Sequence, residues 1–196
     1  MKLTITHQER YSRGELLLRS FFGMFYITLP HLFLLFFVGI YGAILRLVAF
    51  LVVLFTGKYP ESMFEFQVGL LKWQLRVNAR MLNLSDGYPA FGINGTDEFT
   101  SLEIEYPERL SRGTLILKFL FGFFYVLIPH GFILYFRAIG TMFMVFLAWW
   151  VVLFTGKYPK TWHDFVVGYL RWGVRLSLYY GLWMTDEYPP FTGREV

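Results

Sequence analysis

Apolar residues dominate two long segments of the chain, residues 16–55 and 115–154, and charged residues are almost absent from both. Each segment is far longer than the roughly 20 residues that cross the hydrocarbon core of a bilayer as a helix. As one straight helix, either segment would extend about 60 Å. The pattern therefore predicts a helical hairpin in each segment, with two membrane spans joined by a turn.

Two positions in each segment offer a break for that turn. One is Pro30, with its counterpart Pro129, and the other is the stretch 39–42, with its counterpart 138–141. A turn at the proline would leave Arg46 near the middle of the second span, where an arginine costs several kcal/mol. We therefore expect the turn at residues 39–42.

That turn places Arg46 and Arg137 at or near the far interface of the membrane. It also keeps Pro30 inside the first span, where the missing N–H leaves the carbonyl of Tyr26 free and kinks the helix. The second span of each hairpin is short, which leaves open a hairpin that dips into the bilayer without crossing it. The predicted spans are residues 16–37 and 41–55, and residues 115–136 and 141–154.

The chain is a tandem duplication. A shift of 99 positions places Pro30-His31 on Pro129-His130 and the pentapeptide 56–60 on the identical pentapeptide 155–159. Self-similarity of this kind means that each copy builds the same structural unit. The predicted boundaries are residues 1–91 for the first repeat, 92–99 for a Gly-rich and then acidic linker, and 100–196 for the second repeat.

A third helix is predicted after each hairpin. The pentapeptide Thr-Gly-Lys-Tyr-Pro supplies a glycine for a left-handed helix cap, a lysine beside the negative helix end and a proline as a stop. Ser62 with Glu65, and Thr161 with Asp164, then have the spacing of a capping box. We expect amphipathic helices over residues 62–84 and 161–183.

Basic residues on these two helices follow a narrow stripe, as a helix lying along a membrane surface would have. The simplest interpretation is a surface helix that anchors the fold; a dedicated site for anionic lipid and a polar lumen remain as alternatives. The candidate headgroup contacts are Arg13, Lys58, Tyr59, Lys72, Arg76, Arg112, Lys157, Tyr158, Arg171 and Arg175.

Both repeats carry basic residues at the ends of their apolar segments, which indicates that the two units have the same orientation under the positive-inside rule. Residues 3–6 and 102–105 alternate between apolar and polar, as strands do. The predicted fold is an all-α integral membrane protein. It has two parallel repeats, each a transmembrane hairpin with an interfacial amphipathic helix, and short β segments at the cytoplasmic face with both termini.

Composition agrees with a membrane protein, because 56% of the 196 residues are hydrophobic, 23 are Phe and only 16% are charged. The net charge of +4 favours anionic headgroups over nucleic acid, since the basic residues follow the membrane pattern. The chain contains no cysteine, which excludes disulfides, thiolate metal sites and a cysteine nucleophile.

Candidate chemistry is sparse. The sequence has no Gly-rich phosphate loop, no metal-ligand spacing and no nucleophile beside a base, so we expect no catalytic or metal site. His31 and His130 lie at equivalent places in the first spans and form a candidate intramembrane polar site. They have the symmetry of two axial haem ligands, but a structural role beside backbone freed by the proline is favoured over a cofactor. Asp86 and Asp186 precede Tyr-Pro and are expected to form turns.

Several motifs occur together in the second repeat: Glu-Arg-x-Ser-Arg-Gly from residue 108, Pro129-His130, the pentapeptide 155–159, Arg171-Trp172 and Thr-Asp-x-Tyr-Pro-Pro-Phe from residue 185. This set resembles a family of bacterial membrane proteins catalogued only as a domain of unknown function. The resemblance covers nearly the whole chain twice and is weaker in the first repeat, where Lys72-Trp73 and Pro89-Ala90 depart from the pattern. It implies a bacterial membrane location and no activity.

Three classes of function fit these features. The first is a non-enzymatic integral membrane subunit or scaffold in the inner membrane, multi-pass, that packs against anionic lipid and a larger membrane-protein complex or a second copy. The second is a protein that handles lipids or transports a small solute through the seam between the repeats, with His31 and His130 lining it. The third is a haem-binding redox subunit. The first class best fits the lack of a chemical site.

Overall fold

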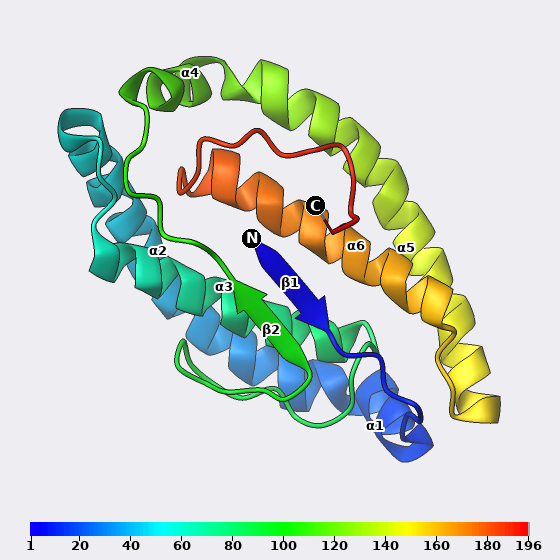
Figure 1. Cartoon of the computed structure of the whole chain (residues 1–196). Helices are drawn as coiled ribbons and strands as arrows, with labels where there is room; N and C mark the ends of the chain where they lie inside the picture. The colour runs from blue at the N-terminus through cyan, green and yellow to red at the C-terminus, as the bar shows by residue number, and fades with distance from the viewer. Residues whose placement is uncertain (196) are drawn as a thin grey trace.

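A computed structural model of the chain describes residues 1–195 as two copies of one mostly helical arrangement (Figure 1). The first repeat contains β1 (Lys2–Ile5), α1 (Arg13–Gly23), the π-helical turn η1 (Met24–Thr28), α2 (Leu29–Thr56) and α3 (Glu61–Met81). The second repeat contains β2 (Thr100–Glu103), α4 (Arg112–Gly122), η2 (Phe123–Leu127), α5 (Ile128–Thr155), α6 (Lys160–Leu176) and η3 (Ser177–Gly181).

Each apolar segment forms one uninterrupted helix, so the predicted hairpin turn is wrong. α1, η1 and α2 together form a 44-residue helix, Arg13–Thr56, and α4, η2 and α5 form its counterpart, Arg112–Thr155. Both are long and apolar enough to cross a membrane. Gly42 does not make a turn, because α3 packs directly against it: a Cβ there would lie 3.1 Å from the side chain of Leu70, and Gln67 donates a hydrogen bond to its carbonyl.

The free carbonyl predicted before the proline is confirmed. The helix widens into a π-turn just before Pro30, which releases backbone carbonyls from the helical ladder. The hydroxyl of Tyr88 donates to the freed carbonyl of Tyr26 at 2.9 Å, and Tyr188 donates to Tyr125 in the second repeat at 3.0 Å. The proline therefore creates the attachment point for the segment that follows the third helix.

The sequence predicted the ends of the long helices correctly and the starts of the third helices incorrectly. Gly57 and Gly156 adopt the left-handed conformation expected of helix caps, with φ of 73° and 71°. The capping boxes are wrong, because α3 and α6 begin directly after Pro60 and Pro159 and have no side-chain cap. Pro60 and Pro159 occupy the N-cap positions with extended ψ angles of 126° and 124°, and their carbonyls accept the first helical hydrogen bonds, from Phe64 and His163.

The two long helices run along opposite sides of the molecule, with α3 and α6 between them (Figure 1). The start of each long helix adjoins the end of the other. The backbone N–H of Tyr11 donates to Gly156, and Leu110 donates to Gly57, at 2.9 and 2.8 Å. These reciprocal bonds relate the repeats by an internal twofold arrangement and close the long helices into a frame.

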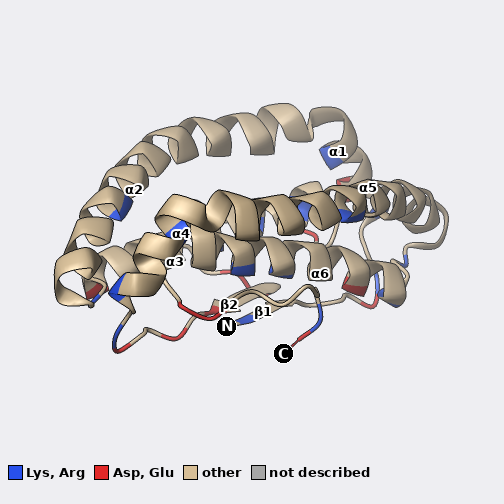
Figure 2. Cartoon of the chain, turned by 90° about the horizontal axis from the view of Figure 1, so that it is seen from above, with Lys and Arg blue, Asp and Glu red and all other residues tan. Residues whose placement is uncertain are grey.

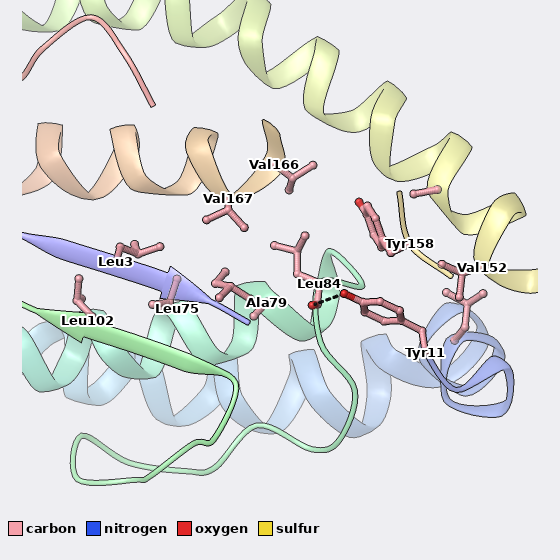
Figure 3. Close-up of a cluster of buried hydrophobic side chains, with 13 residues drawn as sticks. Leu3, Tyr11, Leu75, Ala79, Leu84, Leu102, Val152, Tyr158, Val166 and Val167 are labelled. Atoms are coloured by element: carbon pink, nitrogen blue, oxygen red, sulfur yellow. Dashed lines mark hydrogen bonds between the residues drawn. The ribbon is translucent and has the colours of Figure 1, made fainter. Parts of the chain in front are cut away.

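β1 and β2 form a two-stranded antiparallel sheet, which confirms the predicted β segments, and Leu3 pairs with Leu102 at its centre. The sheet covers α3 and α6, and its inward side chains enter an apolar core with Leu75 and Val167 (Figure 3). Tyr11 closes the same core by donating its hydroxyl to the carbonyl of Leu84 at 3.4 Å. The seam between the repeats is therefore filled by apolar side chains.

Polarity is divided between two faces of the molecule. The sheet and both described chain ends lie along one edge in Figure 2, and the arched helix Arg13–Thr56 lies along the opposite edge. Among residues 1–195, 44 large hydrophobic side chains are exposed, and 38 of them belong to the two long helices. One face of the protein is thus apolar and the other carries the sheet and the charged loops.

Candidate functional site

His31 and His130 each lie at the centre of an aromatic cage. The indole N–H of Trp73 donates to Nδ1 of His31 at 2.8 Å, and Phe91 stacks on the imidazole with ring centroids 4.0 Å apart. Because Nδ1 accepts this bond, the neutral ring carries its proton on Nε2. Nε2 is buried and has no hydrogen-bond partner within the described chain.

The second repeat builds the same cage from Trp172 and Phe191. The Trp172 N–H donates to His130 Nδ1 at 2.9 Å, and the His130 and Phe191 centroids are also 4.0 Å apart. The cages share no residue, so the structure does not bring His31 and His130 into one site. Each imidazole instead ties the long helix to the third helix and to the Tyr-Pro segment that follows it.

Asp86 and Asp186 fasten the start of each long helix and do not form the turns predicted for them. One carboxylate oxygen of Asp86 accepts the backbone N–H of Ser12 at 2.6 Å, and the other accepts a hydrogen bond from Arg19 at 3.0 Å. Asp186 does the same with the backbone of Ser111 and the ammonium group of Lys118. These charges are paired within the fold, which explains how Arg19 and Lys118 are tolerated in apolar helices.

The basic stripe on the third helices is largely buried, which corrects the predicted headgroup contacts. Arg76 is 2% exposed and donates to the carbonyl of Ala90 and to two carbonyls of the linker, those of Gly92 and Gly95, at 2.5 to 3.2 Å. Arginine forms this fan of bonds readily because it carries five N–H donors. Arg76 therefore holds the linker in place and is not available to lipid.

In the second repeat, Arg171 and Arg175 hold the C-terminal tail, which we define as residues 182–195. Arg171 is 8% exposed and donates to the carbonyls of Leu3 and Gly193 at 2.9 and 2.8 Å. Arg175 is half-buried and donates to Thr192 at 3.1 Å. Tyr59 and Tyr158 are also buried, so the prediction of headgroup contacts fails for both tyrosines. The predicted contacts that remain exposed are Arg13, Lys58, Lys72, Arg112 and Lys157.

Arg80 makes a buried ion pair that the sequence did not reveal. Its guanidinium donates to both carboxylate oxygens of Asp97, at 2.8 and 2.5 Å, and both side chains are at least nine-tenths buried. Burial acts to raise the pKa of Asp97, but hydrogen bonds from Arg80 and Thr100 outweigh it, and the pKa lies below its usual value. Asp97 belongs to the linker, so this pair fastens the junction of the two repeats.

The arginines of the long helices do not extend to a far interface as predicted. Arg46 reaches across to the second repeat and donates to the carbonyl of Gly181 at 3.2 Å. Arg137 crosses α6, donates to the carbonyl of Phe165 at 3.2 Å and lies with its guanidinium 4.5 Å from the Phe165 ring centroid. Both side chains thus extend toward the inner helices, away from the apolar face.

An open cleft lies where Arg137 emerges, between α5, the start of α6 and the C-terminal tail. We call it the tail cleft; its charged lining residues are Arg137, Lys160, Asp164, Arg171, Arg194 and Glu195. This group of charged residues was not predicted as a site. A comparison of the two repeats could have indicated it, because Val38 and Glu61 occupy the positions of Arg137 and Lys160 in the first repeat.

A histidine pair distinguishes the second repeat at the repeat junction. The rings of His7 and His163 are 5.0 Å apart, and His7 Nε2 lies 2.7 Å from the carbonyl of Tyr158. Burial is the main cause that lowers the pKa of His163, to about 4, and nearby His7 lowers it further. The shift of 99 positions maps His7 onto Tyr106 of the second repeat and His163 onto Phe64 of the first, and these two rings pack edge to face.

Comparison with known proteins agrees with the duplication. The model of a family described as Domain of unknown function (DUF4389) matches residues 16–92 and again residues 117–193. Neither curated proteins nor solved structures give a match.

Proposed function

We propose that this chain, which belongs to the DUF4389 family and carries the family's domain twice, is a membrane-embedded subunit or scaffold without catalytic chemistry of its own. In this role it packs its long helices against lipid and against a larger membrane-protein partner or a second copy. The resemblance to bacterial membrane proteins favours the inner membrane. The basic helix ends favour a cytoplasmic position for the sheet face.

The observation that carries this proposal is the apolar face of the two long helices. Soluble monomers rarely expose contiguous apolar patches larger than a few hundred Å². Here 38 large hydrophobic side chains are exposed on the two long helices, among them Phe21, Phe25 and Phe55, each at 69% or more. Water would be a poor solvent for such a surface, whereas lipid acyl chains match it.

The arrangement favours embedding from one side of the bilayer rather than a straight crossing. A straight 44-residue helix is about 66 Å long, twice the roughly 30 Å of a hydrocarbon core. The sheet lies alongside the helices (Figure 1), so a crossing orientation would carry Glu103, which is exposed at the end of β2, and the neighbouring Glu105 to bilayer depth. With the frame lying along the surface, the helices bow into one leaflet and the charged face stays in water.

The polar side chains support a structural role, because the notable ones serve folding contacts. The two histidines are held in aromatic cages, Asp86 and Asp186 fasten helix starts, and the stripe arginines hold backbone carbonyls. The apolar core at the seam does not favour transport between the repeats. The separate cages do not favour a haem bridging both histidines.

Reconstitution tests the proposal. The purified protein is mixed with preformed vesicles and also co-reconstituted from detergent, washed at alkaline pH and floated on a density gradient. An embedded protein floats after the wash only when it was co-reconstituted, whereas release by the wash would contradict embedding. Native mass spectrometry of protein extracted from its own membrane then measures assembly. A fixed stoichiometry of copies or of one membrane-protein partner is expected, and a lone monomer would contradict the scaffold.

A further inference from the structure

We propose that the tail cleft binds the phosphate group of an anionic phospholipid, one per chain, with Arg137 as the main contact. This inference deepens the proposed function and depends on it, because the lipid comes from the leaflet in which the long helices are embedded. The first repeat has a cleft at the equivalent place, lined by Glu61, Glu65 and Lys72. That cleft does not have the charge for this ligand.

The position of Arg137 needs an explanation. It lies in the middle of a helix whose outer face is apolar, where an arginine is costly unless it has partners. The only hydrogen bond of its guanidinium within the described chain is the one to Phe165, and its buried Nε has no partner there. The Phe165 ring and the backbone at Gly168 hold the planar group in position. A fixed guanidinium with free donors is suited to an oxyanion.

The surroundings of Arg137 have the charge that such a ligand requires. Four basic residues and two acidic residues line the tail cleft, whereas one basic and two acidic residues line the equivalent cleft of the first repeat. Lys160 and Arg194 are both exposed, and Lys160 forms an ion pair with Asp164 at 2.8 Å. Lys160 also begins the 17-residue helix α6, whose N-terminus favours negative charge.

The position of the cleft identifies a lipid rather than a free anion as the source of the phosphate. The cleft is bounded by the C-terminal tail on the charged side of the molecule. On the other side of Arg137, Phe136 and Ile139 are 57% and 51% exposed on the apolar face of α5. A phospholipid places a phosphate next to acyl chains and therefore matches both surfaces at once, as inorganic phosphate does not.

The duplication supplies substitutions that the fold already accommodates. Val38 fills the place of Arg137 in the first repeat and Glu61 fills that of Lys160, so Arg137→Val and Lys160→Glu copy one repeat onto the other. Lys72→Glu makes the same change of charge as Lys160→Glu on an exposed site away from the tail cleft. It controls for the general attraction between a basic protein and anionic lipid.

The experiment measures lipid retention by native mass spectrometry of detergent-purified protein titrated with phosphatidylglycerol or phosphatidylcholine. We expect the unaltered protein to retain one phosphatidylglycerol in preference to phosphatidylcholine. Arg137→Val should weaken that binding at least tenfold, Lys160→Glu by a smaller factor, and Lys72→Glu should leave it unchanged. Arg137→Lys should recover part of the loss, because lysine restores the charge without the planar fork.

Two results would overturn the proposal. Equal weakening by Lys72→Glu and Arg137→Val would show that retention depends on overall charge and not on the cleft. Displacement of the lipid by inorganic phosphate at similar concentration would assign the site to a free anion. Flotation of the Arg137→Val protein on the alkaline gradient separates the two ideas: an embedded variant that does not retain the lipid supports the cleft, whereas a protein that never floats contradicts the proposed function itself.

Discussion

The two repeats share the contacts that position the long helices and differ in several charged and titratable groups around them. Both contain the His-Trp cage, the tyrosine bond to the carbonyl freed by proline, and the aspartate at the start of the long helix. They differ in the tail cleft and at the histidine pair, where basic or titratable groups replace Val38, Glu61 and Phe64. The two repeats therefore share one structural frame, and at these positions the second repeat carries basic or titratable groups that differ from the first.

The largest expected effect breaks a contact found in only one repeat. Arg80→Met removes the partner of Asp97 and leaves a buried carboxylate unpaired, which costs about 3–5 kcal/mol. The equivalent residue in the second repeat is Tyr179, which makes a hydroxyl contact with Tyr125 instead. Tyr179→Phe should cost about 1 kcal/mol. Chemical denaturation in detergent measures both, and equal losses would show that the ion pair adds no more than the tyrosine contact.

The next effect is a pH dependence from the second repeat alone. The pKa of His163 is lowered to about 4 by burial, so the folded state disfavours its protonation and the unfolded chain binds the proton first. Stability from this group is therefore present above pH 6.5 and is lost as the pH falls toward 4, by about 3 kcal/mol in total. His163→Phe, which copies Phe64, should flatten that part of the curve of unfolding free energy against pH. An unchanged curve in the variant would exclude His163 as the cause.

The aromatic cages should respond alike in the two repeats. Trp73→Phe and Trp172→Phe each remove the indole N–H and leave a buried imidazole nitrogen unsatisfied, at a cost of about 2 kcal/mol. Thermal unfolding of each variant measures the loss. Because the sites have the same geometry, the two costs should agree within experimental error. A large difference would mean that only one cage is structural and that the other histidine has a separate role.

The smallest expected effect concerns the tyrosines that bind the freed carbonyls. Tyr88→Phe and Tyr188→Phe should each cost about 1 kcal/mol, the net contribution of one hydrogen bond. Restoring the helical ladder tests the link to proline, because Pro30→Ala supplies the missing N–H to the Tyr26 carbonyl. In the Pro30→Ala protein, Tyr88→Phe should therefore reduce the free energy of unfolding by less than it does in the unaltered protein. Fully additive losses would contradict the assignment of the Tyr88 bond to a carbonyl freed by Pro30.

The sequence predicted the features that depend on local chemistry. The duplication, the paired strands, the glycine caps and the carbonyl freed by Pro30 all follow from residue type and spacing. The turn at residues 39–42 failed because the function of Gly42 is set by α3, which approaches it from a distant part of the chain. The surface stripe failed for the same reason: Arg76 and Arg171 are covered by loops whose path no periodicity reveals. Arg137 was placed at an interface, but its partners lie on another helix.

The most direct test of the central claim is the sidedness of the helix ends. The chain has no cysteine, so single cysteines at Lys58 and Lys157 report their positions without background. Both side chains are exposed and follow the ends of the two long helices. One-sided embedding predicts that a membrane-impermeant thiol reagent labels both from the same side of sealed vesicles, whereas a cysteine at Phe136 is labelled only after solubilisation. Labelling of positions 58 and 157 from opposite sides would contradict the account.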